Sequence, residues 1–376
     1  MMANADQIVQ RLLDDLEPKI DLAHVSAVAA RHRAALNYEP LDRLPLVFYL
    51  PYEGQEFTPY SHAEAFFDPA RLMVNELLTG FTSIYHAVEL KDDSPYCLRP
   101  NLGVVLISSM LGAKIQVMDD QPPWVLPFGD MQQIKEIVEA LPPDFSAGLL
   151  PRVLEQYDYF RTALADYPNC RAAFQLTLPD LQGPFDIAEM IWGSSIFMAF
   201  YDEVELLSAL LAKITDTIIH VQCRLRTEVK ENLGSHCQYQ HAVGVKGQIL
   251  LRNDTAIMLS PQHYRDLVQP HDARIAGELG SVAIHFCGNG QHQVDNMLTM
   301  PNFTCFDFGQ PWMMDSDAIY AKAAAQKVPL SRMRLPTERL TVAEARERFP
   351  TGVILTCEPD SVAHAHQLWH QYIGEF

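Results

Sequence analysis

The segment that best indicates the fold runs from Ser281 to Gly290 and reads SVAIHFCGNG. Residues 282–287 are apolar apart from one histidine, which predicts a buried strand, and the glycines that follow predict a turn. Side chains alternate along a strand, so His285 and Cys287, two residues apart, are expected on the same face. The segment therefore predicts a buried strand that carries a histidine and a cysteine at its carboxyl end.

Similar segments recur along the chain and alternate with helical patterns. Strands are expected at residues 44–50, 83–88, 170–176, 241–252, 282–287, 303–308, 332–335 and 352–357. Helices are expected at 62–79, at 203–227 and from Ser260-Pro261 to Glu278, where serine and proline form a typical helix start. Eight strands that alternate with helices predict an α/β fold, the (β/α)₈ TIM barrel.

Two parts of the chain are expected to decorate this barrel. Residues 1–38 show apolar residues at helical spacing and predict a helical N-terminal extension. Residues 113–118 alternate and run into Asp119-Asp120-Gln121-Pro122-Pro123, which predicts a hairpin insertion. A barrel with insertions accommodates 376 residues around one core, so residues 1–376 are expected to form a single domain.

Composition and charge exclude several classes of protein. The chain has 28 Lys and Arg against 47 Asp and Glu, a net charge of −19 that opposes nucleic-acid binding. Arg332, Arg334 and Arg339 form one of its densest basic runs and are expected on a solvated face. No run approaches the roughly 20 apolar residues of a membrane span, and no signal peptide is recognisable, so a soluble, cytoplasmic protein is expected. Seven scattered cysteines do not resemble a disulfide framework.

A metal site is expected at the carboxyl ends of the barrel strands, where the active sites of TIM barrels form. His285 and Cys287 offer two zinc donors, and Cys357 ends the last strand as Cys287 ends its own. A His/Cys/Cys set leaves the fourth tetrahedral position open, as in catalytic zinc sites. His86, His241 and Glu89 are candidate fourth ligands. The alternative is that these cysteines and histidines are ordinary core residues.

Other polar residues also follow predicted strands. Asp180 and Gln182 are predicted as catalytic residues at the barrel mouth. An equally weighted alternative is that they form a turn in which their side chains hydrogen-bond to the local backbone. Asp254 and Asn289 are predicted to bind substrate, although capping and turn formation also explain such residues.

Several segments, in order along the chain, carry a family resemblance. They are residues 39–45 (EPLDRLP), 123–125 (PWV), 180–186 (DLQGPFD), 259–264 (LSPQHY) and 284–289 (IHFCGN). The chain resembles the uroporphyrinogen decarboxylase superfamily, and within it the branch of cobalamin-dependent methyltransferases that act on thiols. The resemblance implies zinc bound by His285, Cys287 and Cys357, although Glu358-Pro359-Asp360-Ser361 departs from the turn expected after the last cysteine.

The resemblance implies a zinc-dependent methyltransferase. The methyl donor would be methylcobalamin or a methylated corrinoid on a small corrinoid-binding partner protein, and the acceptor a thiol or similar group. Residues 47–53 contain no arginine, whereas true uroporphyrinogen decarboxylases use an arginine of this region to bind substrate carboxylates. A cofactor-independent decarboxylase and a non-catalytic metal- or corrinoid-binding protein remain the alternatives, because fold alone does not decide among them.

Overall fold

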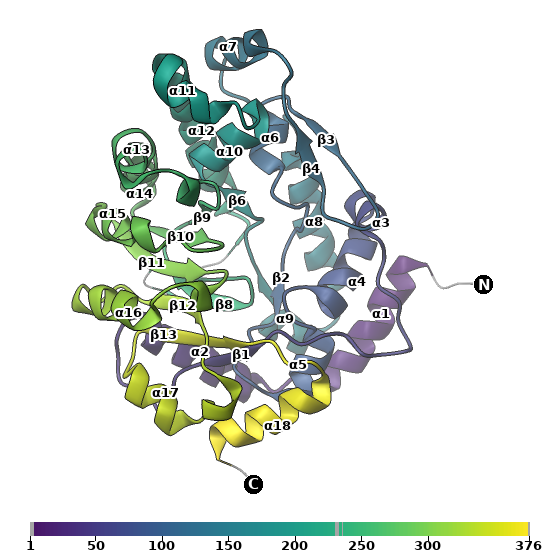
Figure 1. The fold of residues 1–376 in the computed structure, drawn as a ribbon. Helices are drawn as coiled ribbons and strands as arrows, with labels where there is room; N and C mark the ends of the chain where they lie inside the picture. The colour runs from purple at the N-terminus through teal and green to yellow at the C-terminus, as the bar shows by residue number, and fades with distance from the viewer. Residues whose placement is uncertain (1–3, 230–232, 235, 375–376) are drawn as a thin grey trace.

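The chain forms a central parallel sheet surrounded by helices. The computed structural model describes residues 4–229, 233–234 and 236–374 (Figure 1). The sheet has the strand order β1-β13-β12-β11-β10-β9-β6, and every neighbouring pair is parallel. Its strands are β1 (Leu46–Phe48), β6 (Leu181–Gln182), β9 (Leu250–Arg252), β10 (Val282–Phe286), β11 (Phe303–Phe308), β12 (Leu330–Met333) and β13 (Val353–Cys357).

Two short strands lie in the gap between the edges of this sheet. β2 (Cys97–Leu98) pairs in parallel with β5 (Gln175–Leu176), and β6 follows β5 along the chain. Residues 175–182 thus reach from β2 to β9, which completes the eight strand positions of a TIM barrel. Between β1 and β2 two carboxylates replace strand pairing, since Asp93 Oδ2 accepts from Leu46 N (2.9 Å) and Asp92 Oδ2 from Phe48 N (2.7 Å). The described strands around the barrel thus form a seven-stranded sheet and a two-stranded sheet rather than one continuous backbone ladder.

Helices cover the outside of the sheet, as Figure 1 shows for α14 to α18. Those of the second half are α10 (Pro184–Trp192), α11 (Ile196–Asp202), α12 (Val204–Leu225), α13 (Pro261–His263), α14 (Gln269–Leu279), α15 (Val294–Thr299), α16 (Ser316–Ala325), α17 (Val342–Arg348) and α18 (Val362–Ile373). Those of the first half are α3 (His62–Phe67), α4 (Pro69–Thr79), α5 (Ile84–Leu90), α6 (Leu106–Met110), α7 (Met131–Glu139), α8 (Leu150–Ala163) and α9 (Pro168–Ala173). None of the helices in the described part of the chain is both long and apolar enough to cross a membrane.

The N-terminal segment is helical, as predicted, and consists of α1 (Ala5–Leu16) and α2 (Leu22–Leu36). α2 packs against β13 and against β8 (Val243–Lys246), the second strand of an antiparallel hairpin with β7 (Cys237–Gln240). The buried imidazole of His32 in α2 connects the segment before β2 with strand β8. Its Nε2 lies 2.8 Å from Asp93 O, and its Nδ1 accepts from Gly244 N (3.1 Å). This arrangement closes the amino-terminal end of the barrel.

Three predicted strands differ from the structure. Residues 83–88 are helical, in α5, and residues 170–173 lie in α9, so the second and third barrel strands are 97–98 and 175–176. In α5 the buried residues Ile84, Ala87 and Val88 have helical spacing, which a short apolar run shares with a buried strand. Residues 241–252 contain the turn of the β7–β8 hairpin before β9 begins. The predicted hairpin at 113–118 is confirmed, since β3 (Lys114–Gln116) pairs antiparallel with β4 (Trp124–Leu126).

The strand side chains separate into two buried layers. Val47, Leu250, Ala283, Cys305 and Ile354 pack together with the β7–β8 hairpin inside the barrel. Their strand neighbours face the helices and include Phe48, Leu251, Ile284, Phe306 and Leu355. Because side chains alternate along β10, the inward set that begins with Ala283 continues with His285 and Cys287 toward the carboxyl end.

Candidate functional site

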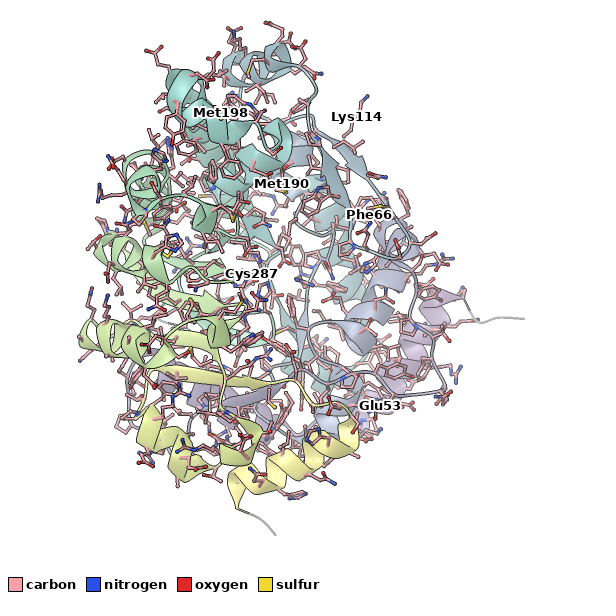
Figure 2. All side chains as sticks on the ribbon, in the orientation of Figure 1. Glu53, Phe66, Lys114, Met190, Met198 and Cys287 are labelled. Atoms are coloured by element: carbon pink, nitrogen blue, oxygen red, sulfur yellow. The ribbon has the colours of Figure 1, made fainter. Side chains whose placement is uncertain are left out.

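The candidate site lies at the carboxyl end of β10. Figure 2 shows Cys287 in the middle of the molecule, where this strand ends. His285 and Cys287 lie together as predicted, with 3.4 Å between His285 Nε2 and Cys287 Sγ. His285 is buried, while Cys287 is partly exposed. The strand thus presents a nitrogen and a sulfur donor side by side.

Asp254, in the loop after β9, supplies a third donor. Its Oδ1 accepts a hydrogen bond from Cys287 N (2.6 Å) and lies 3.6 Å from His285 Nε2. The ligand atoms of Asp254, His285 and Cys287 all lie within 4.8 Å of one another. Carboxylate oxygen, imidazole nitrogen and thiolate sulfur are all zinc donors, so the three residues fit zinc. About 35% of the Asp254 side chain is exposed, which leaves the site open on that side.

The Cys287 side chain is a protonated thiol when no metal ion is bound. Burial raises the pKa of this thiol to about 11, and the nearby Asp254 carboxylate adds to the shift. The protonated sulfur can donate to His285 Nε2, which agrees with the distance of 3.4 Å between them. A metal ion bound here would displace that proton, since zinc binds the thiolate.

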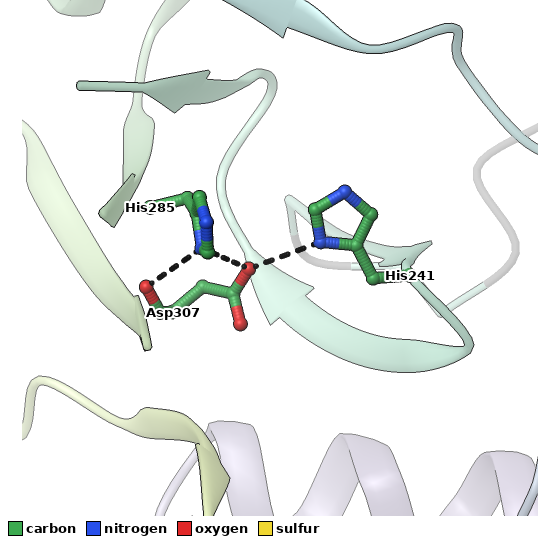
Figure 3. A group of neighbouring side chains, drawn as sticks. All are labelled: His241, His285 and Asp307. Carbon is green, nitrogen blue, oxygen red and sulfur yellow. Dashed lines mark hydrogen bonds and ion pairs between the residues drawn. The ribbon is translucent and has the colours of Figure 1, made fainter. Parts of the chain in front are cut away.

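The second ring nitrogen of His285 faces Asp307 on β11. His285 Nδ1 lies 3.1 Å from both the backbone oxygen and the Oδ2 atom of Asp307 (Figure 3). Arg332 Nη2, which can only donate, also contacts Nδ1. When Nδ1 carries the proton, His285 donates to Asp307 instead, and the Nε2 lone pair is directed at Cys287 and Asp254. A carboxylate that accepts from one imidazole nitrogen while the other binds metal is a common support of zinc sites.

A second group of possible ligands shares His285. The ligand atoms of His241, His285 and Asp307 also lie within 4.8 Å of one another, and all three residues are buried. Figure 3 shows the two imidazoles around the Asp307 carboxylate, with His241 Nδ1 3.5 Å from Oδ2. His241 Nε2 already accepts from Arg252, and burial together with Arg252 and Arg332 lowers the pKa of His241 to about 4. Because His241 Nε2 accepts from Arg252, Nδ1 carries the proton and faces Asp307, so the Asp254 group fits zinc better.

Asp180 and Gln182, predicted as catalytic, face the barrel interior but differ in their partners. Asp180 accepts from Arg99 Nη1 (2.6 Å) and Arg252 Nη2 (2.5 Å). Burial opposes ionisation of Asp180, but Arg252 and Arg99 outweigh it and hold the pKa of this carboxyl well below its usual range. A carboxylate so firmly ionised is a weak base, so Asp180 anchors the arginines. Gln182 is buried, and its Oε1 has no hydrogen-bond partner in the described part of the chain.

The remaining candidates lie elsewhere. Asn289 is exposed and its Oδ1 accepts from Gln291 N (3.2 Å), which forms a turn. Cys357 ends β13 at the same edge of the sheet as Cys287, but it packs in the outward-facing layer with Val353 and Leu355. Within the described residues, neither group of ligand atoms includes Cys357.

Two of the proposed fourth ligands also have other partners. His86 Nε2 accepts from Glu53 N (3.2 Å), and Glu89 pairs with Lys19 at 2.7 Å. Of the three residues considered for this position, His241 alone lies near His285. Its engagement with Arg252 argues against a ligand role here.

Three arginines of the barrel interior were not predicted from the sequence. Arg99, Arg252 and Arg332 are buried and pair with Asp180 or Asp307. The expectation that Arg332 lies on a solvated face is wrong, because its side chain points into the barrel and binds Asp307. The available signal was position, since Arg252 follows two leucines in its strand and Arg332 lies in a strand of four buried residues.

Comparisons with known proteins agree with this architecture. A family model described as "Uroporphyrinogen decarboxylase (URO-D)" matches residues 29–331. A solved structure described as a methyltransferase from Methanosarcina mazei is similar, with a TM-score of 0.62 and 17% sequence identity over 91% of this chain and 96% of that chain. No curated protein matches the chain. At this identity the structural likeness concerns the fold, and the predicted α/β TIM barrel is confirmed.

Proposed function

The chain belongs to the uroporphyrinogen decarboxylase family, and from that premise we propose that it is a zinc-dependent methyltransferase. The proposed reaction moves a methyl group from a methylated corrinoid, carried by a small partner protein, to a thiol. The observation that carries the proposal is the convergence of Asp254, His285 and Cys287 within 4.8 Å of one another. The Methanosarcina mazei protein of similar fold is described as a methyltransferase, which supports the same reaction class.

Asp254, His285 and Cys287 would hold the zinc ion, and the open side next to Asp254 would admit the acceptor. Zinc bound there supplies the positive charge that favours a thiolate over a thiol, and the thiolate is the nucleophile. Asp307 holds His285 in the tautomer that directs Nε2 at the site. Cys357, a ligand in the expected His/Cys/Cys set, is the alternative third donor and would have to turn inward from β13.

Methyl transfer needs few further groups from the protein. The acceptor thiol loses its proton to solvent, the new carbon–sulfur bond forms as the cobalt–carbon bond breaks, and cobalt keeps the electron pair. The methyl carrier has to approach the carboxyl end of the barrel, because Cys287 and Asp254 are reached from that end. We place this chemistry in the cytoplasm, where thiols and corrinoid cofactors stay reduced.

The arginines of the barrel interior bear on the main rival, a decarboxylase. A substrate with many carboxylates needs cationic partners, and Arg99, Arg252 and Arg332 are buried inside the barrel. All three already pair with Asp180 or Asp307, so they offer little charge to a substrate. This favours methyl transfer over decarboxylation.

The test supplies purified protein with methylcobalamin and a panel of small thiols, then with a methylated corrinoid protein encoded near its gene. The expected products are a methyl thioether and demethylated corrinoid, and chelation of zinc should stop their formation. Carbon dioxide released from uroporphyrinogen, unaffected by chelation, would replace the proposal with a decarboxylase. Zinc bound without either reaction would favour a non-catalytic binding protein.

A further inference from the structure

Arg332 occupies an unusual place in the barrel wall. It lies in β12, where the pairing with β13 shifts between Leu330, opposite Val353, and Met333, opposite Leu355. β12 therefore has one residue more than β13 over this interval, which is a β-bulge. The backbone of Arg332 has a φ of +60°, a left-handed conformation that is uncommon outside glycine.

The bulge turns two consecutive side chains into the barrel. Ser331 Oγ donates to Gly244 O (2.6 Å) in the hairpin inside the barrel. Arg332 is only 8% exposed and donates to Asp307, from Nε to Oδ1 (2.5 Å) and from Nη2 to Oδ2 (2.9 Å). In a regular strand one of these neighbours would face the helices. A strained backbone that directs a buried charge at a site points to function.

We propose that Arg332 is a positioning residue that acts through Asp307 on His285. The two-pronged bond to Arg332 holds the Asp307 carboxylate in one orientation, with Oδ2 3.1 Å from His285 Nδ1. That carboxylate in turn holds the imidazole with Nε2 directed at Cys287 and Asp254. The inference rests on the proposed zinc site and assigns a role to a residue outside its ligands.

The charge balance explains why both partners are needed. A guanidinium so close to His285 opposes a bound cation, and Arg332 Nη2 contacts His285 Nδ1. The Asp307 carboxylate neutralises that charge and, when Nδ1 carries the proton, accepts the hydrogen bond from it in place of the guanidinium. Loss of the Asp307 carboxylate alone would leave the Arg332 guanidinium buried and unpaired beside the metal site. Loss of both side chains would remove the repulsion between the guanidinium and the metal, together with the hydrogen bond that orients His285.

The experiment measures metal affinity, with Co²⁺ and Zn²⁺ as probes in competition with a chelator, on the full chain. The variants are Arg332→Lys, Arg332→Met, Asp307→Asn and the double variant Asp307→Asn/Arg332→Met. Arg99→Lys is the matched control, because this buried barrel arginine pairs with Asp180 instead. Thermal unfolding of each variant separates loss of fold from loss of metal.

We expect Arg332→Met to weaken metal binding by about 10- to 100-fold and Arg332→Lys to weaken it less. Asp307→Asn should bind more weakly than the double variant, and Arg99→Lys should stay within about twofold of the unmodified protein. In the Co²⁺-loaded Arg332→Lys variant, the thiolate-to-cobalt absorption band should change. This substitution keeps the positive charge and is the least disruptive one to the fold. Unchanged affinity and spectrum in both Arg332 variants would overturn the inference while the zinc site stands. An unmodified protein that binds neither metal would instead refute the zinc site and, with it, this role of Arg332.

Discussion

Gly309, just after β11, passes so close to Cys287 that a Cβ atom built on the glycine would lie 2.6 Å from the Cys287 sulfur. The same Cβ would lie 3.1 Å from Cys287 Cα, so rotation of the sulfur alone cannot relieve the contact. Gly309 N also donates to Phe286 O (3.0 Å), which holds the two strand ends together. Glycine at this position leaves room for the cysteine.

Gly309→Ala should therefore weaken zinc binding by at least about tenfold, since the added methyl group displaces a metal donor. Gly277→Ala, in α14, is the control, because a Cβ there meets no atom within 4 Å. Zinc affinity and thermal unfolding should be measured on both variants. Wild-type affinity in Gly309→Ala would mean that the Cys287 sulfur does not need its present position.

Cys287→Ala should remove the metal. Protein purified without chelator should carry about one zinc per chain, and loss of the sulfur donor should reduce this to a trace. Cys223→Ala should retain the metal, because Cys223 is exposed on α12 and belongs to neither group of candidate ligands among the described residues. Elemental analysis of the two proteins is the measurement, and equal zinc in both would refute the assignment.

The third donor can be identified with two substitutions. Asp254→Asn keeps an oxygen that accepts from Cys287 N but removes the charge, so we expect zinc affinity to fall by about tenfold or more. Cys357→Ser should have little effect if Asp254 is the ligand, since Cys357 packs in the outward layer. The reverse pattern would restore the His285, Cys287 and Cys357 set implied by the family resemblance.

His32 should make the protein less stable in mild acid. Burial lowers the pKa of His32 to about 4, so between this value and about 6.5 the unfolded chain binds a proton that the folded chain does not. The free energy of unfolding should therefore decrease as the pH is lowered, and His32 should contribute about 2 kcal/mol to this decrease between pH 7.5 and pH 5.

His32→Gln should flatten this dependence, because the amide can replace the neutral imidazole without titrating. His220→Gln is the control, since His220 is exposed and stacks on Phe145. Urea unfolding at the two pH values gives the comparison. An identical slope in His32→Gln and in the unmodified protein would contradict the prediction.

The barrel and the His285–Cys287 pair could be predicted from the amino-acid sequence. Strands β1, β10, β11 and β13 are long enough and apolar enough to be recognised, and alternation along β10 places His285 beside Cys287. Residues 83–88 were misread as a strand because a short apolar run fits a buried helix equally well. The two-residue strands β2 and β5 have no pattern of their own, since their pairing depends on neighbours far away in the chain.

The residues that surround His285 and Cys287 could be identified only from the folded chain. Asp254 follows β9 and Asp307 lies in β11, the two strands on either side of β10. The sequence places Asp254 after a strand, but it marks neither aspartate as a neighbour of His285. Arg332 enters the barrel because of a bulge, and one extra residue in a strand reverses the face on which the following side chains lie. Cys357 and Cys287 both end a strand, but the Cys357 side chain faces the helices and the Cys287 side chain faces the barrel interior. Which way a strand residue faces depends on the register of the strand, and pairing with residues far away in the chain sets that register.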